Sequence, residues 1–258
     1  MNVVTWPKGT VKALSRRLRM HYGDKERHAA MDRLYGAFLK PGDLVFDIGA
    51  HLGDRISAFR RLGARVIALE PDPGPARAIR LIHRRDPLVT LIQAACGDHE
   101  GSIALRISRT DPATSTVSAA FLGAGAGMRE QPERQERQEQ LWGHEITVPC
   151  TTLDKLIARH GLPDLLKIDV EGFEAHVLAG LTRAVPAISF EFATERRDVA
   201  EGCLALPYTL RRYRFNLTLG DSQRLALAEP VTAEAMGEHL RGLPRSAGSG
   251  DVYAVLRG

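Results

Sequence analysis

Two carboxylates and a pair of glycines stand where a nucleotide-type ligand would be bound. Asp47 lies near the end of the apolar run 44–48, Gly49 and Gly53 follow it, and a second apolar run ends at Glu70. In a strand–loop–helix unit, glycines let the backbone approach a ligand and the helix offers free N–H groups to an anion. A carboxylate closing the second strand accepts hydrogen bonds from ribose hydroxyls. The pattern predicts an adenosine-containing cofactor at the carboxyl edge of a parallel sheet.

The glycine spacing indicates which cofactor. Dinucleotide sites use G-x-G-x-x-G, so that the backbone can pack against a pyrophosphate. Here His51 stands between Gly49 and Gly53, where a middle glycine would be needed. S-adenosylmethionine carries an amino acid and no phosphate, so it suits this loop better. Its ammonium can bind Asp47, and its carboxylate can lie near the N–H groups around Gly53. The same glycines also occur in crossovers without a ligand, and Glu70 is the feature that favours a cofactor.

The predicted cofactor contacts lie in this loop, at the next strand end and after a third strand. They are Asp47, Gly49, Ala50, His51, Gly53, Asp54, Glu70, Pro71, Asp72, Cys96, Asp98 and Asp169. Asp98 could accept from the adenine amino group, although a simple turn explains its surroundings equally well. His51 could contact the cofactor carboxylate or act as a base, and a contact through its backbone is the simpler interpretation.

Three separated motifs, in the same order, resemble a known protein family. They are Asp47–Gly53 with Glu70-Pro71-Asp72, then Thr151–Leu156, then Asp164–Glu174 followed by Val177–Leu181. These motifs are similar to the signature of the FkbM family of S-adenosylmethionine-dependent methyltransferases, over roughly residues 30–195. The chain departs from the family's pattern at His51, where an Asn is more usual, and in a long segment at 111–145.

The candidate acceptor-side residues follow the strand expected at 164–169. Lys167 and Asp169 share one face of that strand, Glu171 continues the row into the loop, and Glu191 closes the next strand. Methyl transfer from a sulfonium is an in-line displacement, so an enzyme positions the reactants and removes a proton when the acceptor is a hydroxyl. Asp169 or Glu171 could act as base. Alternatively, these two with Glu191 could hold a divalent metal that lowers the pKa of the hydroxyl.

Structural alternatives remain open for these residues. Lys167 and Asp169 could pair with each other, and Glu171 could serve the following helix as an N-terminal acid. No motif with the spacing of metal ligands accompanies them, so the sequence assigns no metal-binding residue. The catalytic candidates are therefore Asp169, Glu171, Lys167, Glu191 and His51.

Short apolar runs alternate with helical patterns along most of the chain. Strands are expected near 44–48, 65–69, 88–95, 164–169, 187–192, 213–219 and 252–257, and helices near 26–39, 54–62, 74–84, 152–160, 173–181 and 197–211. This alternation predicts a doubly wound, mostly parallel seven-stranded sheet with helices on both faces, an α/β fold of the Rossmann-like kind. The family resemblance implies a final antiparallel hairpin. No helix of obvious strength is expected between the last two strands.

Two domain-level features accompany this fold. Residues 1–40 are expected to form an N-terminal helical extension, whose amphipathic pattern at Val11, Leu14 and Leu18 could mediate a homodimer. Residues 41–258 would form the methyltransferase domain.

A long segment interrupts the rhythm of this domain. Residues 108–145 are interpreted either as a lid over the acceptor, with Ser115 and Thr116 touching it, or as a mobile surface insertion. Tyr22, or Tyr35 from the helix expected at 26–39, could also reach the cleft.

Composition excludes several classes of function. A net charge of +4 on 258 residues is too small and dispersed to indicate a nucleic-acid partner. No apolar stretch approaches the length of a membrane span, and no leader pattern is found. Three cysteines without a C-x-x-C spacing are typical of buried thiols in a reducing cytoplasm.

The predicted activity follows from the family resemblance. It implies O-methylation of a hydroxyl on a small natural product or glycan. Two other functions stay open: an S-adenosylmethionine-binding module without catalysis, and a nicotinamide-dependent dehydrogenase. The missing dinucleotide glycine spacing disfavours the dehydrogenase.

Overall fold

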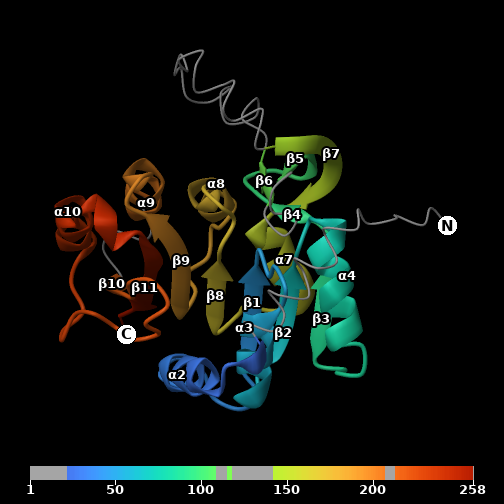
Figure 1. The fold of residues 1–258 in the computed structure, drawn as a ribbon, viewed down its shortest axis with the longest axis horizontal. Helices are drawn as coiled ribbons and strands as arrows, with labels where there is room; N and C mark the ends of the chain where they lie inside the picture. The colour runs from blue at the N-terminus through green and yellow to red at the C-terminus, as the bar shows by residue number, and fades with distance from the viewer. Residues whose placement is uncertain (1–21, 109–114, 118–141, 207–212, 258) are drawn as a thin grey trace.

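The computed structural model of the chain describes residues 22–108, 115–117, 142–206 and 213–257. Within them, a seven-stranded sheet runs through the centre with helices on both sides (Figure 1). Its strands, in spatial order, are β10 (Tyr213–Leu217), β11 (Ser249–Leu256), β9 (Ala187–Ala193), β8 (Leu165–Ile168), β1 (Leu44–Ile48), β2 (Arg65–Leu69) and β3 (Val89–Ile92). This is the doubly wound α/β fold that the sequence predicts.

The direction of the strands places the candidate site. β1 pairs in parallel with β2 on one side and with β8 on the other, and β3 and β9 extend the sheet in parallel on either flank. The chain therefore changes direction across the sheet at β1, and ligands of such sheets bind at the carboxyl ends of the strands at this switch point. β11 lies antiparallel between β9 and β10, which confirms the expected antiparallel hairpin.

Two sets of helices cover the two faces of the sheet. One buried cluster contains side chains of α2 (Lys25–Tyr35), α3 (Asp54–Arg61) and α4 (Pro73–Ile82). The other contains side chains of α7 (Leu153–His160), α8 (Glu174–Ala179), α9 (Arg197–Leu204) and α10 (Ala233–Gly242).

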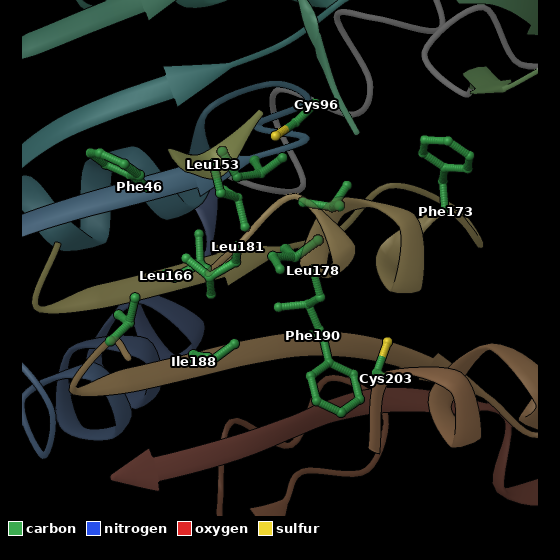
Figure 2. Packing of buried hydrophobic residues seen from close by; sticks show 14 of the residues in the cluster. Phe46, Cys96, Leu153, Leu166, Phe173, Leu178, Leu181, Ile188, Phe190 and Cys203 are labelled. Carbon is green, nitrogen blue, oxygen red and sulfur yellow. The ribbon is translucent and has the colours of Figure 1, made fainter. Parts of the chain in front are cut away.

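Apolar side chains between sheet and helices hold the second face together. Figure 2 shows Leu166 of β8 within this cluster, close to Leu153 of α7 and Leu181 after α8. Full burial of one such leucine contributes about 1.5–3 kcal/mol. This packing fixes where β8 ends, and with it the position of the residues that follow.

A second sheet stands at the carboxyl-end side of the first, in the upper right of Figure 1. Its order is β4 (Ala95–Cys96), β7 (Trp142–Thr151), β5 (Gly101–Ser108) and β6 (Ser115–Val117). The sequence interpretation missed this sheet, although Ile103, Leu105 and Ile107 alternate in β5 and are buried. It also merged β3 and β4 into a single strand at 88–95, whereas the two belong to different sheets.

The prediction that no helix separates the last two strands was wrong. α10 lies between β10 and β11, and Thr232 caps it by accepting a hydrogen bond from the backbone N–H of Ala235. Ala233, Met236 and Leu240 bury one face at helical spacing, and this pattern is the signal that was overlooked. The helix expected at 197–211 ends at Leu204, and those expected at 26–39 and 173–181 are also shorter.

Two predicted features fall largely outside the described residues. Residues 1–21, with the amphipathic N-terminal pattern, lie outside them, as do 109–114 and 118–141 of the predicted lid. Ser115 and Thr116 belong to β6, whose backbone pairs with β5. Within the described ranges, no helix combines the length and the apolar character needed to cross a bilayer.

Candidate active site

A tight contact joins the glycine loop to the end of β8. Gly49 has a φ of +80°, and a Cβ built on it would stand 1.8 Å from the carbonyl oxygen of Asp169. The backbone N–H groups of Gly49 and Ala50 both donate to the carbonyl of Leu69, each at 2.9 Å. The loop is therefore held between the ends of β2 and β8, and only glycine fits at its first position.

The middle of the loop has a left-handed turn. His51 has a φ of +49°, a conformation that few residue types other than glycine adopt, with Asn, Asp and His the most tolerant. This explains how His51 can stand where the family resemblance leads one to expect Asn. Gly53, at a φ of +78°, donates its N–H to the carbonyl of Ala50 at 2.8 Å and is the N-cap of α3.

Glu70 ties the loop to the end of β2. One carboxylate oxygen accepts the backbone N–H of His51 and the other accepts that of Asp72, both at 2.8 Å. The side chain is buried, and burial raises its pKa to about 8. Asp72 in turn caps α4 by accepting the N–H of Gly74 at 2.8 Å. The predicted ribose acceptor therefore also shapes the loop.

Asp47 brings an incompletely paired carboxylate to the same place. The residue is only 1% exposed, and its Oδ2 has no hydrogen-bond partner among the described residues. Burial raises its pKa to about 7, against the opposing charges of Arg55 and Lys167. Because buried polar atoms are almost always hydrogen-bonded, this oxygen is available to accept a hydrogen bond from a ligand.

A buried ion network lies next to Asp47. Lys167 pairs with Asp47 in the register of β1 and β8, and it is fully buried. Its Nζ donates to Asp251 Oδ1 at 2.9 Å, to the carbonyl of Ile168 at 3.2 Å and to Asp169 Oδ2 at 3.4 Å. The Lys167–Asp169 pair that the sequence left as an alternative is confirmed. Asp251, from the last strand, was not found by sequence reasoning.

Arg55 completes the network from the helix side. Its Nη2 lies 3.3 Å from Asp169 Oδ2 and 3.9 Å from Asp251 Oδ2. Burial would raise the pKa of Asp169, but the charges of Lys167 and Arg55 outweigh it and hold that pKa below the ordinary value. Asp169 is therefore an ionised carboxylate. Sequence reasoning selected Asp54 in this turn but passed over Arg55.

Glu191 forms a carboxyl pair with Asp169. It stands opposite Asp251 in the register of β9 and β11, and its side chain hydrogen-bonds to Asp169. Burial and the charge of Asp169 raise the pKa of Glu191 to about 9, and Glu171 adds to this shift. Glu191 therefore keeps a proton that it donates to Asp169, and the two acids of the pair differ in protonation.

A cavity of about 280 Å³ opens beside this pair. Its lining residues are Glu171, Gly172, Glu174, Glu191, Phe192, Ala193, Arg196, Val199 and Ser249. Glu171 is exposed with a φ of +55°, and the buried Glu174 accepts the N–H groups of Val170 at 2.9 Å and Gly172 at 3.2 Å. Glu174, which sequence reasoning did not select, is the acid in the first turn of α8.

Two of the predicted cofactor residues, Asp54 and Asp98, form charged contacts with other side chains. Asp54 forms an ion pair with Arg27 at 2.8 Å, and the exposed Asp98 lies 2.6 Å from His99 Nδ1. Cys96 is buried in β4 and Pro71 is half-buried between Glu70 and Asp72. None of these contacts reaches the carboxyl pair.

Tyr35 is fully buried under the network. Its ring packs edge-on against Phe59 at 4.8 Å between ring centroids. Tyr22 lies nearer the loop, where its hydroxyl donates to the carbonyl of Leu52 at 2.9 Å. Tyr22 is therefore better placed than Tyr35 to border the cofactor loop.

The alternative of a divalent metal held by Asp169, Glu171 and Glu191 finds no support among the described residues. Among the residues that the structure describes, no group of three or more His, Cys, Asp and Glu side chains has an arrangement that could hold a metal ion. Lys167 and Arg55 instead form ion pairs with the carboxylate of Asp169.

Comparison with known proteins decides the family. Residues 47–219 match the model of the methyltransferase FkbM domain. The chain belongs to the FkbM methyltransferase family. It is 33% identical, over 177 residues, to the 31-O-demethyl-FK506 methyltransferase of Streptomyces tacrolimicus, a match that covers 61% of this chain and 68% of that one.

Solved structures also resemble this FkbM-family chain. One is a TehB-like S-adenosylmethionine-dependent methyltransferase from Corynebacterium glutamicum, with a TM-score of 0.48, 12% identity and coverage of 98% of this chain and 100% of that one. Another is an O-methyltransferase from Bacillus cereus in complex with S-adenosylhomocysteine, with a TM-score of 0.44, 12% identity and coverage of 99% and 94%.

S-adenosylmethionine is the cofactor of this FkbM-family methyltransferase. The residues present fit it. The unpartnered Oδ2 of Asp47 matches the cofactor's ammonium, and the loop at Gly49 offers backbone that no side chain shields.

A paired glycine substitution tests the loop contact. Gly49→Ala adds a methyl group against the carbonyl of Asp169, whereas Gly42→Ala, also at positive φ (+94°), meets no atom within 4 Å. We expect Gly42→Ala to cost about 1–2 kcal/mol through its backbone conformation alone. Gly49→Ala should cost about 4 kcal/mol or more and abolish cofactor binding. Urea unfolding measures the stability of each variant, and calorimetry with S-adenosylhomocysteine measures its cofactor binding. Equal losses of stability in the two variants would contradict the contact.

Asp47 should make stability depend on pH. Its folded pKa of about 7 lies above the unfolded value, so the folded state retains a proton that the unfolded state has lost. Between pH 5 and pH 8 the free energy of unfolding of the wild type should therefore fall by about 2–3 kcal/mol relative to that of Asp47→Asn, which has no ionisable group at this position. Urea unfolding without cofactor at both pH values measures this difference. If the difference in free energy of unfolding between the two proteins is the same at both pH values, Asp47 ionises normally.

Proposed function

We propose that this protein transfers a methyl group from S-adenosylmethionine to the oxygen of an acceptor hydroxyl bound in the cavity beside Glu191. The observation that carries the proposal is the Asp169–Glu191 pair, which lies between the glycine loop and that cavity. The relative from Streptomyces tacrolimicus is named a 31-O-demethyl-FK506 methyltransferase, a name that specifies an oxygen acceptor.

The cofactor half of the site is assigned to the residues around the loop. When bound, the sulfonium of S-adenosylmethionine supplies an activated methyl group. Asp47 would accept the ammonium, and Glu70 would accept from the ribose through lone pairs that its two backbone hydrogen bonds leave over. Ala50, His51 and Gly53 would border the ligand through their backbone. Asp72, Asp98 and the other predicted contacts remain predictions.

Proton removal falls to Glu191. It borders the cavity directly, and its raised pKa makes its ionised form a base strong enough for a hydroxyl. Asp169 is held ionised by Lys167 and Arg55, so it is a weaker base and instead orients the carboxyl group of Glu191. Because Glu191 is protonated at rest, it first releases that proton to solvent, and its ionised form then accepts the hydroxyl proton as the oxygen gains the methyl group. Glu171, on the exposed rim, would contact the acceptor.

The cavity limits the part of the acceptor that it can hold. A volume of about 280 Å³ is near the lower end for ligand pockets, which suits one ring of a natural product or glycan. Its lining combines carboxylates with the apolar side chains of Phe192 and Val199. A sugar or hydroxylated ring presents matching polar edges and apolar faces. We therefore propose a hydroxylated ring, not a protein or nucleic acid, as the acceptor.

Transfer of label tests the activity. Purified protein is incubated with methyl-labelled S-adenosylmethionine and an extract of the host fractionated by size, with and without a chelator, and label is followed by mass spectrometry. We expect label on oxygen in a small-molecule or glycan fraction. Retention of the cofactor without any labelled product would instead favour a binding module, and label on nitrogen or protein would overturn the acceptor assignment.

Glutamine substitutions test the proposed base. Glu191→Gln keeps the size of the side chain but cannot accept a proton, so turnover should fall by about 10²–10⁴-fold. S-adenosylhomocysteine affinity should stay the same within about threefold. The wild-type rate should rise as pH approaches about 9, because the ionised fraction of Glu191 increases, and this rise should vanish in the variant. Glu195→Gln, an exposed position that does not line the cavity, is the control, and a wild-type pH profile for Glu191→Gln would exclude it as the base.

A further inference from the structure

Two charged groups beside the glycine loop each keep one buried atom without a hydrogen-bond partner among the described residues. They are Asp47 Oδ2, an acceptor, and Arg55 Nε, a donor. The proposed reaction gives Asp47 a ligand but assigns Arg55 only its contact with Asp169. The unused donor is therefore unexplained, and such a group in a native interior normally has a partner.

Arg55 reaches across the site from the helix that follows the loop. It is the second residue of α3, and its Nη2 extends to Asp169 at 3.3 Å and Asp251 at 3.9 Å. One side of the guanidinium is thus held by the carboxylates at the ends of β8 and β11. Its Nε, on the chain side of the guanidinium, has no hydrogen-bond partner among the described residues. The charge of Arg55 also acts on Asp47, since it is the largest influence that opposes the burial effect on the pKa of that acid.

This pair of unused atoms matches the two charges of an α-amino acid. Its ammonium needs an acceptor and its carboxylate needs a donor, and hydrogen bonds between ions are the strong ones. We propose that Arg55 binds the carboxylate of the methionine part of the cofactor while Asp47 holds the ammonium. Arg55 is then a cofactor-binding residue in addition to its contact with Asp169. This inference rests on the proposed function, because it assumes the cofactor lies in the glycine loop.

The assignment refines the sequence interpretation of the loop. The carboxylate was expected near the backbone N–H groups around Gly53, which are dipoles without net charge. Arg55 lies two residues further on and adds a full positive charge, while Lys167 is already fully used by three oxygen atoms. The affinity for a ligand that keeps the adenosine but lacks the amino acid should therefore not depend on Arg55.

Truncated ligands test this directly. Calorimetry compares S-adenosylhomocysteine with 5′-methylthioadenosine, which has the same nucleoside and thioether but no amino acid, on wild type, Arg55→Met and Arg55→Lys. We expect Arg55→Met to weaken S-adenosylhomocysteine binding about 10–100-fold and to leave 5′-methylthioadenosine binding the same within about twofold. Arg55→Lys should lie between. Arg61→Met is the control, because Arg61 is on the same helix and pairs with Asp32 at 2.7 Å.

The outcomes separate this inference from the proposed function. Equal losses for both ligands, or no loss for either, would overturn the role of Arg55 while leaving the cofactor site in place. Failure of the wild type to bind S-adenosylhomocysteine would remove the proposed function and the inference with it. If thermal unfolding shows that Arg55→Met does not fold, the test uses Arg55→Lys. The measured quantity is then the ratio of its affinities for S-adenosylhomocysteine and 5′-methylthioadenosine. A ratio equal to that of the wild type overturns the role of Arg55.

Discussion

A fully buried ammonium group is the constraint on which the site depends. Lys167 stands in the middle of the sheet, and an unpaired charge there would cost several kcal/mol. Its three partners are the carbonyl of Ile168 and the carboxylates of Asp169 and Asp251. Asp251 comes from the last strand, so the antiparallel insertion of β11 beside β9 satisfies the charge and aligns Asp169 in one arrangement. The site is therefore complete only when the C-terminal strand is in place.

The network also divides the acids of the site into two kinds. Lys167 and Arg55 lower the pKa of Asp169, whereas Glu191, beside an existing negative charge, has a raised pKa. Two neighbouring carboxyl groups with pKa values displaced in opposite directions are typical of acid–base sites. Asp47 is displaced upward as well, mainly by burial, and a bound cation would favour its ionised form. The electrostatic arrangement thus suits a ligand that brings a positive charge.

Much of the fold could be predicted because it is recorded in local patterns. The apolar runs 44–48 and 65–69 became β1 and β2 with the same bounds, since a strand buried on both faces is a continuous apolar segment. The second sheet could not be predicted as readily: its strands β5 and β7 are separated by a long segment, and pairing between distant segments leaves no local signal. The sequence of α10 has a helical period, but the segment is short and less apolar than the neighbouring strands, so its signal is weak.

The sequence by itself determined the glycine loop, the acid at the end of β2 and the motif around Asp169, because each is a local unit of strand, turn and helix. The positive φ of Gly49 favours glycine by itself, and the close approach of the Asp169 carbonyl adds a steric requirement once β8 is in place. Only the tertiary structure decided that Asp169 faces Glu191, and that Arg55 and Asp251 reach it from a helix and from the last strand. Ion pairs of this kind join residues far apart in the chain, so their partners and protonation states exist only once the sheet is assembled.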